Sequence, residues 1–331
     1  MQVVFTLCSI NYLSQAKTLG TSVLRHNPDY KFIIGLIDKN HLGIDLSFLG
    51  DLELLEVEKI CIDGFEEMSA RYSIVELATA SKPFYFDYLF KHYPDAEAVT
   101  YFDPDIKVFA PLTEMAEKLK VSNVILTPHF TRPITDSLLP TEKHVLNTGV
   151  FNLGFAAMKR GAEADALNSW WMGKLRHECL LDLTRGYFVD QLWMNLAPAY
   201  FDKVLIEKHP GWNTAHWNLH ERTVTEVDGR FLVNQQPLIF FHFSHYSPKR
   251  PDTIASYHTR FSFATRPDLV TLYKQYNDDL VANRYLDLIG VPCFYMNNER
   301  RKGLKKKAMG WLRQNVPSDV KIRLGKLLKR S

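Results

Sequence analysis

The sequence predicts an α/β fold in which a mainly parallel sheet is flanked by helices. The first observation is a strand pattern at residues 3–7, followed by a helical pattern at residues 13–25 and a second strand pattern at residues 31–37. The second is an apolar, β-branched run that leads directly into the carboxylates Asp103 and Asp105. Because ligands of open α/β sheets bind beyond the carboxyl ends of the strands, these carboxylates predict a binding site there.

The bulk composition is typical of a globular protein from a reducing compartment. The 331 residues are 46% hydrophobic and 23% charged, which suits one large domain or two, and no apolar run reaches the length of a membrane span. The chain begins with a strand pattern and has no basic region before it, so we expect no cleaved signal peptide. The cysteines lie far apart, which argues against a disulfide framework or a structural zinc site. They are Cys8, Cys61, Cys179 and Cys293. We therefore expect a cytoplasmic protein.

The pair Asp103 and Asp105 indicates a site for a hard divalent cation. Two anions at the end of a buried strand are costly unless a cation meets them. Carboxylate oxygens suit Mg²⁺ or Mn²⁺, which keep positions open for the phosphates of a nucleotide. Pro104 fixes its own φ and biases Asp103 toward an extended conformation, so the pair is held in place. The alternative is a solvated turn, because Asp-Pro-Asp is also common turn chemistry.

The rest of the first half continues the α/β pattern. Residues 52–57 are compatible with a third strand, and residues 71–90 have the pattern of a helix. We expect an interruption of this helix at Lys82 and Pro83, where Lys82 is either a solvated helix lysine or a partner of a phosphate. Another helix then leads to a strand at residues 123–127. Neither G-x-G-x-x-G nor G-x-x-x-x-G-K-[ST] occurs, so the sequence indicates no dinucleotide fold and no P-loop.

Two stretches in the second half combine apolar runs with single polar residues. Residues 147–155 place glycines around an apolar strand pattern, and Asn147 precedes it like a polar group directed into a cleft. The alternative for this stretch is a hairpin or a bulge. In residues 187–195, Asp190 lies near the expected start of a helix, where a helix cap and a catalytic role explain it equally well.

Aromatic residues and histidines gather before and after a last expected strand. Residues 211–222 are polar and aromatic with little periodicity, which suits a loop that lines a sugar site. The strand at residues 238–241 then leads into His242 and His245, with Lys249 close behind. A single histidine at a strand end is more often structural than a ligand, but two of them beside a lysine favour a functional site.

Five stretches, taken together and in this order, resemble a known family. They are Tyr-Phe-Asp-Pro-Asp-Ile (101–106), Asn-Thr-Gly-Val-Phe-Asn-Leu-Gly-Phe (147–155), Asp-Gln-Leu-Trp-Met-Asn (190–195), Gly-Trp-Asn (211–213) and Phe-Phe-His-Phe-Ser (240–244). The chain resembles the GT-A glycosyltransferases, above all the retaining family-8-type enzymes and related bacterial polysaccharide and lipopolysaccharide glycosyltransferases. The resemblance runs from residue 3 to residue 249, about three quarters of the chain. It implies a GT-A fold, which is a Rossmann-like, mainly parallel sheet flanked by helices.

The resemblance implies a metal site and a donor site. It implies that Asp103, Asp105 and His242 hold Mn²⁺ or Mg²⁺ against the diphosphate of a UDP- or GDP-linked sugar. It places Lys82 near the donor phosphate or sugar, and Asp38 near the nucleotide base and ribose. The other implied base and ribose contacts follow the first strand and are Cys8, Ser9, Asn11 and Tyr12.

The resemblance also implies contacts with the transferred sugar and the acceptor. Asn147 and Gly149 would belong to the donor side, and Asp190 with Gln191 would be the catalytic pair. The chain departs from the family at His245, which stands where the family has a glycine, and the lysine that follows is shifted, so no phosphate contact is assigned to that lysine. The implied acceptor-side residues are Asn213, His216 and Trp217.

The implied function is metal-dependent transfer of a sugar from a nucleotide-diphosphate donor to a glycan or lipid-linked acceptor, with retention, in bacterial surface polysaccharide synthesis. Such transfer passes through an oxocarbenium-like state, and the departing phosphate oxygen can take the proton of the acceptor. Asp190 would act as a nucleophile, an electrostatic stabiliser or a partner of a sugar hydroxyl. Two alternatives remain open. One is a carbohydrate-binding or scaffold protein without the chemistry, and the other is a sugar nucleotidyltransferase, although the Gly-rich basic loop of that class is absent.

The chain changes character toward its C-terminal end. Residues 299–331 contain 12 Lys and Arg against 2 Asp and Glu, whereas the rest of the chain contains 28 against 35. We predict a GT-A domain at residues 1–255, a helical extension at 256–298 and a basic amphipathic tail at 299–331. Basic residues with leucines at helical spacing favour a helix that lies on anionic lipid at the inner face of the plasma membrane. The alternative is a helix packed on the domain. We expect no nucleic-acid partner, because no reader motif accompanies the charge.

Overall fold

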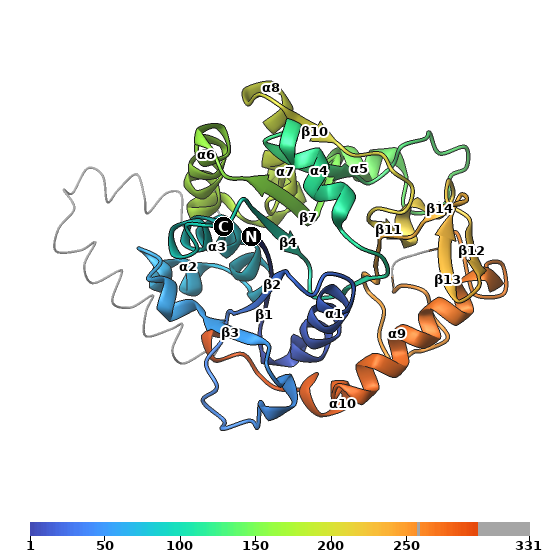
Figure 1. Cartoon of the computed structure of the whole chain (residues 1–331), viewed down its shortest axis with the longest axis horizontal. Coiled ribbons are helices and arrows are strands. Elements are labelled where there is room, and N and C mark those ends of the chain that lie inside the picture. The colour runs from blue at the N-terminus through green and yellow to red at the C-terminus, as the bar shows by residue number, and fades with distance from the viewer. Residues whose placement is uncertain (257–258, 297–331) are drawn as a thin grey trace.

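A computed structural model describes residues 1–256 and 259–296, and its centre is a seven-stranded sheet (Figure 1). The strand order is β10-β6-β7-β4-β1-β2-β3, and neighbours run parallel except at β7, which is antiparallel to both β4 and β6. The predicted α/β fold with a mainly parallel sheet is confirmed. The strands are β1 (Gln2–Cys8), β2 (Lys31–Leu36), β3 (Glu53–Glu56), β4 (Ala98–Phe102), β6 (Val124–Pro128), β7 (Phe151–Lys159) and β10 (Val204–Ile206).

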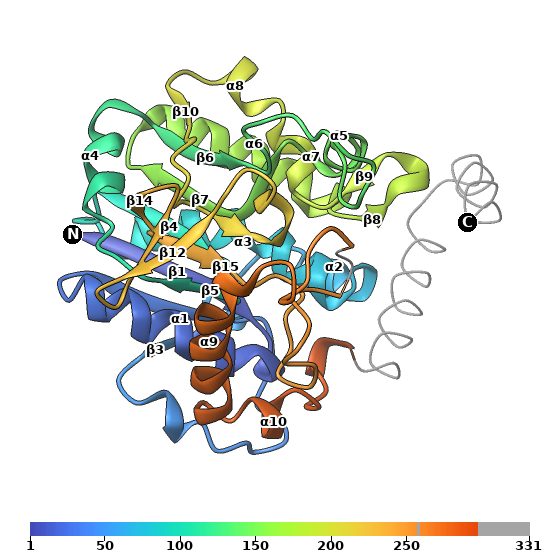
Figure 2. The same ribbon diagram turned by 90° about the vertical axis from the view of Figure 1, so that its right-hand side faces the viewer.

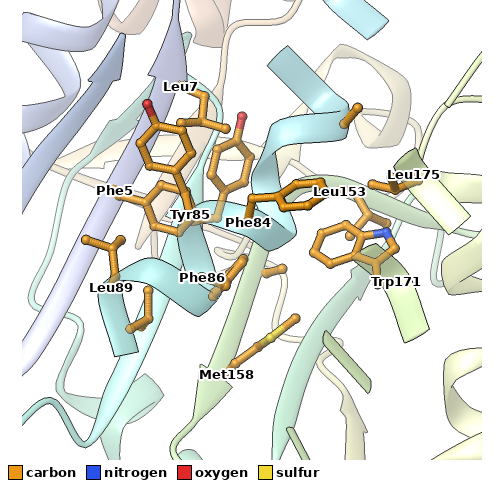
Figure 3. Close-up of a cluster of buried hydrophobic side chains, with 14 of the residues drawn as sticks. Phe5, Leu7, Phe84, Tyr85, Phe86, Leu89, Leu153, Met158, Trp171 and Leu175 are labelled. Atoms are coloured by element: carbon orange, nitrogen blue, oxygen red, sulfur yellow. The ribbon is translucent and has the colours of Figure 1, made fainter. Parts of the chain in front are cut away.

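Helices cover both faces of this sheet, so its central strands are buried on both sides. This is why β1 and β4 read as continuous apolar runs rather than as alternating ones. On one face, Phe5 of β1 packs edge-on against Phe86 at 4.9 Å between ring centroids, and Phe86 faces Trp171 (Figure 3). The helices of this face are α3 (Ile74–His92) and α6 (Ala162–Glu178), and those of the other are α1 (Leu13–His26) and α4 (Thr113–Val121).

Smaller sheets lie beside the main one. A three-stranded sheet in the order β11-β15-β5 pairs His242 with Ile106, and this pairing carries the end of β15 to the turn that follows β4. Its strands are β5 (Ile106–Val108), β11 (Thr214–Ala215) and β15 (Phe240–His242). The remaining strands are β8 (Leu181–Asp182), β9 (Tyr187–Phe188), β12 (Val224–Val227), β13 (Arg230–Val233) and β14 (Gln236–Pro237).

The last described helices pack beside α1 (Figure 2). They are α9 (Val270–Ala282) and α10 (Tyr285–Leu288), and Tyr276 of α9 stacks on Phe243 at 3.8 Å between ring centroids. The other short helices are α2 (Phe65–Arg71), α5 (Glu142–Thr148), α7 (Gln191–Met194) and α8 (Ala197–Tyr200). The 3-10 helices are η1 (Ile10–Tyr12), η2 (Ser47–Leu49), η3 (Val57–Ile60), η4 (Leu183–Arg185), η5 (His216–Asn218), η6 (Pro267–Leu269) and η7 (Phe294–Met296).

The predicted basic tail at residues 299–331 lies outside the described residues, and the division of the chain at residues 255 and 298 stays a prediction. Across residues 1–256 and 259–296, none of the helices combines the length and the apolar character that a membrane span needs.

Two local predictions are wrong. The helix expected at residues 71–90 is not interrupted at Pro83, because α3 runs through that residue. The side chains that follow Pro83 are buried on the sheet, and this packing outweighs the cost of a proline inside a helix, which is about 3 kcal/mol. Asn147 does not directly precede a strand but lies in the last turn of α5, and β7 begins only at Phe151.

Candidate functional site

Asp103, Asp105 and His242 come together beyond the carboxyl end of β4. Nε2 of His242 lies 3.0 Å from Oδ1 of Asp105 and 3.8 Å from Oδ2 of Asp103. One ligand atom from each residue lies within 4.8 Å of the other two. The three residues that the resemblance assigns to a metal therefore form one cluster, which we call the acidic cluster.

The position of His242 depends on a glycine in β7. A Cβ at Gly154 would lie 2.4 Å from Cε1 of His242, which is closer than side chains tolerate. The carbonyl oxygen of Gly154 also accepts the N–H of Asp103 at 2.7 Å. One backbone segment thus supports two members of the acidic cluster.

The residues of the acidic cluster fit a divalent cation. Burial lowers the pKa of His242, but the Asp105 and Asp103 carboxylates outweigh it and leave the pKa raised. Burial raises the pKa of Asp105, but His242 outweighs it and leaves that pKa lowered. The Tyr101 hydroxyl donates to Oδ1 of Asp103 at 2.6 Å, which orients that carboxylate. Two carboxylates and one imidazole nitrogen that face one another are a donor set suited to Mn²⁺ and accessible to Mg²⁺.

A buried ion pair lies next to the acidic cluster. Nζ of Lys82, from α3, lies 2.9 Å from Oδ2 of Asp190 and 3.8 Å from Oδ1 of Asp103, and it donates to the carbonyl oxygen of Leu153 at 2.8 Å. Burial lowers the pKa of Lys82, but the Asp190 and Asp103 carboxylates outweigh it and leave the pKa raised. Asp190 occupies the N-cap position of α7, yet its side chain makes no capping bond. The pairing with Lys82, rather than a cap, therefore accounts for this residue.

Gln191 belongs to a buried network of amides. Its Oε1 accepts from Nδ2 of Asn152 at 3.2 Å, and its Nε2 donates to the carbonyl oxygen of Thr148 at 3.0 Å. Oδ1 of Asn152 accepts from Nδ2 of Asn213 at 3.0 Å. Burial lowers the pKa of His129 to about 4, so this histidine, whose Nε2 lies 3.3 Å from Asn152, is neutral at neutral pH. The network is uncharged and holds Gln191 in place.

Gly149 and Asn147, which the resemblance predicts on the donor side, differ in their surroundings. Gly149 has φ +115°, and a Cβ there would lie 2.7 Å from Cβ of Gln191, so both the backbone and the space require glycine. Asn147 is exposed at the end of α5. The structure brings Gly149, but not the side chain of Asn147, into contact with the amide network.

Residues that follow β1 contribute to the lining of two cavities. Tyr12 and Asp105 line a polar cavity of about 120 Å³, whose other walls come from α1, from the loop after β15 and from α9 and α10. Ser9 and Asn11 line a second cavity of about 310 Å³, and the Ser9 hydroxyl donates to Oδ1 of Asn11 at 2.5 Å. Cys8 is buried at the end of β1, and burial raises the pKa of its thiol.

Of the residues predicted for the acceptor side, Trp217 contacts His242 and His216 contacts Trp217. The ring of Trp217 meets the rings of His242 and His129 edge-on, at centroid distances of 5.1 and 5.4 Å. His216 contacts Trp217 at 5.1 Å between centroids. Asn213 is fully buried with φ +50°, so it supports the site from within.

Three residues of the site were missed in the sequence. Tyr101, His129 and Asn152 were not singled out, although the sequence contains a signal for each. Tyr101 and Asn152 stand two residues before Asp103 and Gly154, and residues two apart in a strand share a face. His129 follows β6 directly, at the same edge of the sheet as the acidic cluster.

The chain is similar to two uncharacterized proteins of Bacillus subtilis (strain 168), whereas no protein-family model matches it. YfnF is 26% identical over 283 residues, which cover 83% of this chain and 90% of YfnF. YfnD is 29% identical over 173 residues, which cover 50% of this chain and 52% of YfnD.

The structure is similar to those of three glycosyltransferases. The galactosyltransferase LgtC, in complex with donor and acceptor sugar analogues, gives a TM-score of 0.48 with 14% identity over 88% of this chain and 98% of LgtC. GlyE of Streptococcus pneumoniae TIGR4 gives 0.47 with 15% identity over 89% of this chain and 66% of GlyE. The bifunctional glycosyltransferase WbbM gives 0.47 with 16% identity over 92% of this chain and 51% of WbbM.

Proposed function

We propose that the protein is a metal-dependent GT-A glycosyltransferase that moves a sugar from a UDP- or GDP-linked donor to a glycan or lipid-linked acceptor. The observation that carries the proposal is the position of the acidic cluster beside the Lys82–Asp190 pair, at the carboxyl edge of the sheet. Oxygen and imidazole donors beside a buried ammonium are suited to a diphosphate, which is both a metal ligand and an anion.

The acidic cluster and Lys82 would both stabilise the negative charge of the leaving diphosphate. Asp103, Asp105 and His242 would hold Mn²⁺ or Mg²⁺, which supplies positive charge to the leaving diphosphate. Lys82 adds a second, fixed positive charge at the same place, because it is held by Asp190 and by a backbone carbonyl. The bond between the sugar and the phosphate oxygen breaks, the bond to the acceptor oxygen forms, and the acceptor proton passes to the departing phosphate oxygen. With retention, both bonds would lie on one face of the sugar.

Asp190 is suited to stabilise the positive charge that develops on the sugar. Its carboxylate is buried and held at 2.9 Å by Lys82, so its position is fixed before the sugar binds. Trp217, which the resemblance assigns to the acceptor side, is buried and meets the ring of His242 edge-on, so it would support this side of the site from within. In line with the resemblance, we further propose that the protein takes part in the synthesis of a bacterial surface polysaccharide. It would work at the cytoplasmic face of the plasma membrane, where the basic tail would bind anionic lipid.

The first test measures thermal unfolding with UDP, GDP and their sugar conjugates, each with and without Mn²⁺. A ligand at 100 times its Kd stabilises the folded state by about 2.7 kcal/mol, so a binding nucleotide raises Tm by several degrees only when Mn²⁺ is present. Asp105→Asn should abolish this rise, whereas Asp278→Asn on the exposed face of α9 should keep it. Equal turnover in EDTA and in Mn²⁺ would refute the role of the metal.

The role of the tail is tested separately in the full chain. Replacing Lys305, Lys306 and Lys307 by Glu should weaken sedimentation with vesicles that contain anionic lipid, because each basic residue near such a surface contributes about 1 kcal/mol. Binding to neutral vesicles is the control. Unchanged sedimentation would argue against membrane attachment without affecting the transferase proposal.

A further inference from the structure

A tight turn after β15 carries a histidine at a place where the backbone favours glycine. The N–H of Tyr246 donates to the carbonyl oxygen of Phe243 at 3.0 Å, which closes a four-residue turn. His245 is the third residue of this turn and has φ +61°. Glycine and asparagine are usual at such a position, because most side chains strain a left-handed backbone. A strained residue beside a candidate site points to a function of its side chain.

The turn is held in a fixed position relative to the acidic cluster. The N–H of Phe243 donates to the carbonyl oxygen of Asp105 at 2.9 Å, and the Phe243 ring stacks on Tyr276 of α9. The carbonyl oxygen of His245 accepts from the Ser256 hydroxyl at 3.4 Å. Contacts on both sides of the turn therefore set the place of His245.

His245 is exposed and lines the polar cavity of about 120 Å³, which Asp105 also lines. The other walls of this cavity carry hydroxyl groups and one amide, from Tyr12, Gln15, Ser244, Tyr246, Tyr276 and Tyr285. Within the described part of the chain, neither Oε1 of Gln15 nor the hydroxyl of Tyr276 has a hydrogen-bond partner, although both side chains are buried. Buried polar atoms are rarely left unpaired, so these two atoms point to a polar occupant of the cavity.

We propose that His245 is a further binding residue of the transferase, and that its imidazole donates a hydrogen bond to the diphosphate of the donor. The proposal rests on the transferase function proposed above. A diphosphate on a cation held by Asp105 would lie beside the cavity that His245 lines, because Asp105 belongs to both. An imidazole has at least one N–H donor in each of its protonation states, so it suits a phosphate oxygen.

The contact would be particular to this chain, because His245 is the residue at which the chain departs from the family that it resembles. The ring of His245 also lies 6.3 Å from that of His216, which is one of the predicted acceptor-side residues. His245 would therefore stand between the diphosphate and the acceptor.

Three substitutions of His245 separate the effect of the side chain from that of the backbone. His245→Gly removes both the imidazole and the strain, whereas His245→Ala removes only the imidazole. His245→Asn suits the left-handed backbone and restores an N–H donor. Isothermal titration of the full chain with Mn²⁺ measures the affinity for inorganic pyrophosphate, UDP and GDP, and thermal unfolding measures Tm.

The affinity and the Tm of these variants should follow different orders. Pyrophosphate should bind about tenfold more weakly to His245→Gly and to His245→Ala, because each loses a hydrogen bond to a charged oxygen. His245→Asn should lose less. The Tm should be higher in His245→Gly than in His245→Ala, because only glycine relieves the backbone. If the residue were merely structural, the affinity would follow the Tm.

Two controls locate the effect. Asp228→Gly relaxes another left-handed residue, with φ +50° in the turn between β12 and β13, and should leave every affinity unchanged. The affinity for Mn²⁺ alone, measured by electron paramagnetic resonance, should change less than about twofold in the three His245 variants, because His245 is not a member of the acidic cluster.

The outcomes separate the two proposals. Equal pyrophosphate affinity in the unchanged chain and in His245→Gly would overturn the role of His245 and leave the transferase proposal standing. This comparison decides the matter even if His245→Ala does not fold, because glycine suits the turn. An equal loss of affinity for Mn²⁺ alone would also overturn the role, because His245 would then act on the metal. If the unchanged chain binds neither UDP, GDP nor pyrophosphate with Mn²⁺, both proposals fall.

Discussion

Lys82 and Asp190 form a buried ion pair, and removing one of the two residues should cost several kcal/mol of stability. Both side chains are almost completely buried, at 5% and 2% exposure, so neither charge can be satisfied by water. Removing one member of such a pair leaves the other as an uncompensated buried charge. Lys82→Met should lower the free energy of unfolding by about 3–5 kcal/mol, whereas Lys82→Met combined with Asp190→Leu should recover most of it. Denaturant unfolding measures both.

The exposed pair Lys274–Asp278 provides the control for this comparison. Lys274→Met should change the free energy of unfolding by less than about 1 kcal/mol, because water solvates both partners. If the double variant of Lys82 and Asp190 has the same free energy of unfolding as Lys82→Met, the loss of stability comes from lost packing and not from an unpaired carboxylate.

Gly154 is the residue on which the geometry of the acidic cluster depends most directly. Gly154→Ala places a methyl group 2.4 Å from Cε1 and 2.8 Å from Nδ1 of His242, so the imidazole must move away from the carboxylates. Mn²⁺ affinity, measured by electron paramagnetic resonance, should fall at least about tenfold, because one ligand leaves the set. Gly173→Ala on α6 is the control, since its new methyl group meets nothing within 4 Å. Equal Mn²⁺ affinity in the two variants would remove His242 from the metal site.

At the scale of elements, α3 shows that local sequence signals determine where a helix begins, whereas tertiary packing determines how far it continues. Its start is set locally by a capping box, in which the Ser73 hydroxyl accepts the N–H of Glu76 at 3.3 Å and Oε2 of Glu76 accepts the N–H of Ser73 at 2.7 Å. Its continuation through Pro83 is set by burial against the sheet. The Ser-x-x-Glu pattern is visible in the sequence, whereas the buried surface that overrides Pro83 is not.

The capping box should contribute measurably to the stability of α3. Ser73→Ala removes the acceptor for the Glu76 N–H and should lower the free energy of unfolding by about 1 kcal/mol. Ser73→Asp keeps an acceptor at the same position and should retain most of the stability. Denaturant unfolding of the three proteins checks this, and equal losses for alanine and aspartate would mean that the cap does not hold the helix start.

At the scale of the whole molecule, the sequence predicted what depends on short segments. The strands β1, β2, β4 and β6 and the turn with Asp103 and Asp105 were predicted because strand periodicity and turn chemistry are local properties. The partners of these residues depend on chain segments far away. His242 reaches the carboxylates through the pairing of β15 with β5, and Asn152 meets Asn213 across 61 positions. The position of His242 at a strand end marked it as a candidate, but its role as a metal ligand came only from the family resemblance, and the amide network was not anticipated at all.

The ion pair between Arg260 and Asp136 should make the Tm of the protein depend on pH below about pH 4. Nε of Arg260 lies 2.9 Å from Oδ2 of Asp136, and its Nη2 lies 2.8 Å from Oδ1 and donates to the carbonyl oxygens of Leu138 and Pro140. The hydrogen bond from Arg260 lowers the pKa of Asp136 to about 2. A carboxylate with a lowered pKa stabilises the folded state above its unfolded pKa, near 3.9, and loses this contribution as pH falls through its folded pKa. The Tm difference between the unchanged chain and Asp136→Asn should thus stay constant from pH 7 to about 4 and shrink toward pH 2. A Tm difference that stays the same at pH 2 would mean that the charge of Asp136 does not contribute to its link with Arg260. The shape of the side chain would then hold residues 136–140 against Arg260.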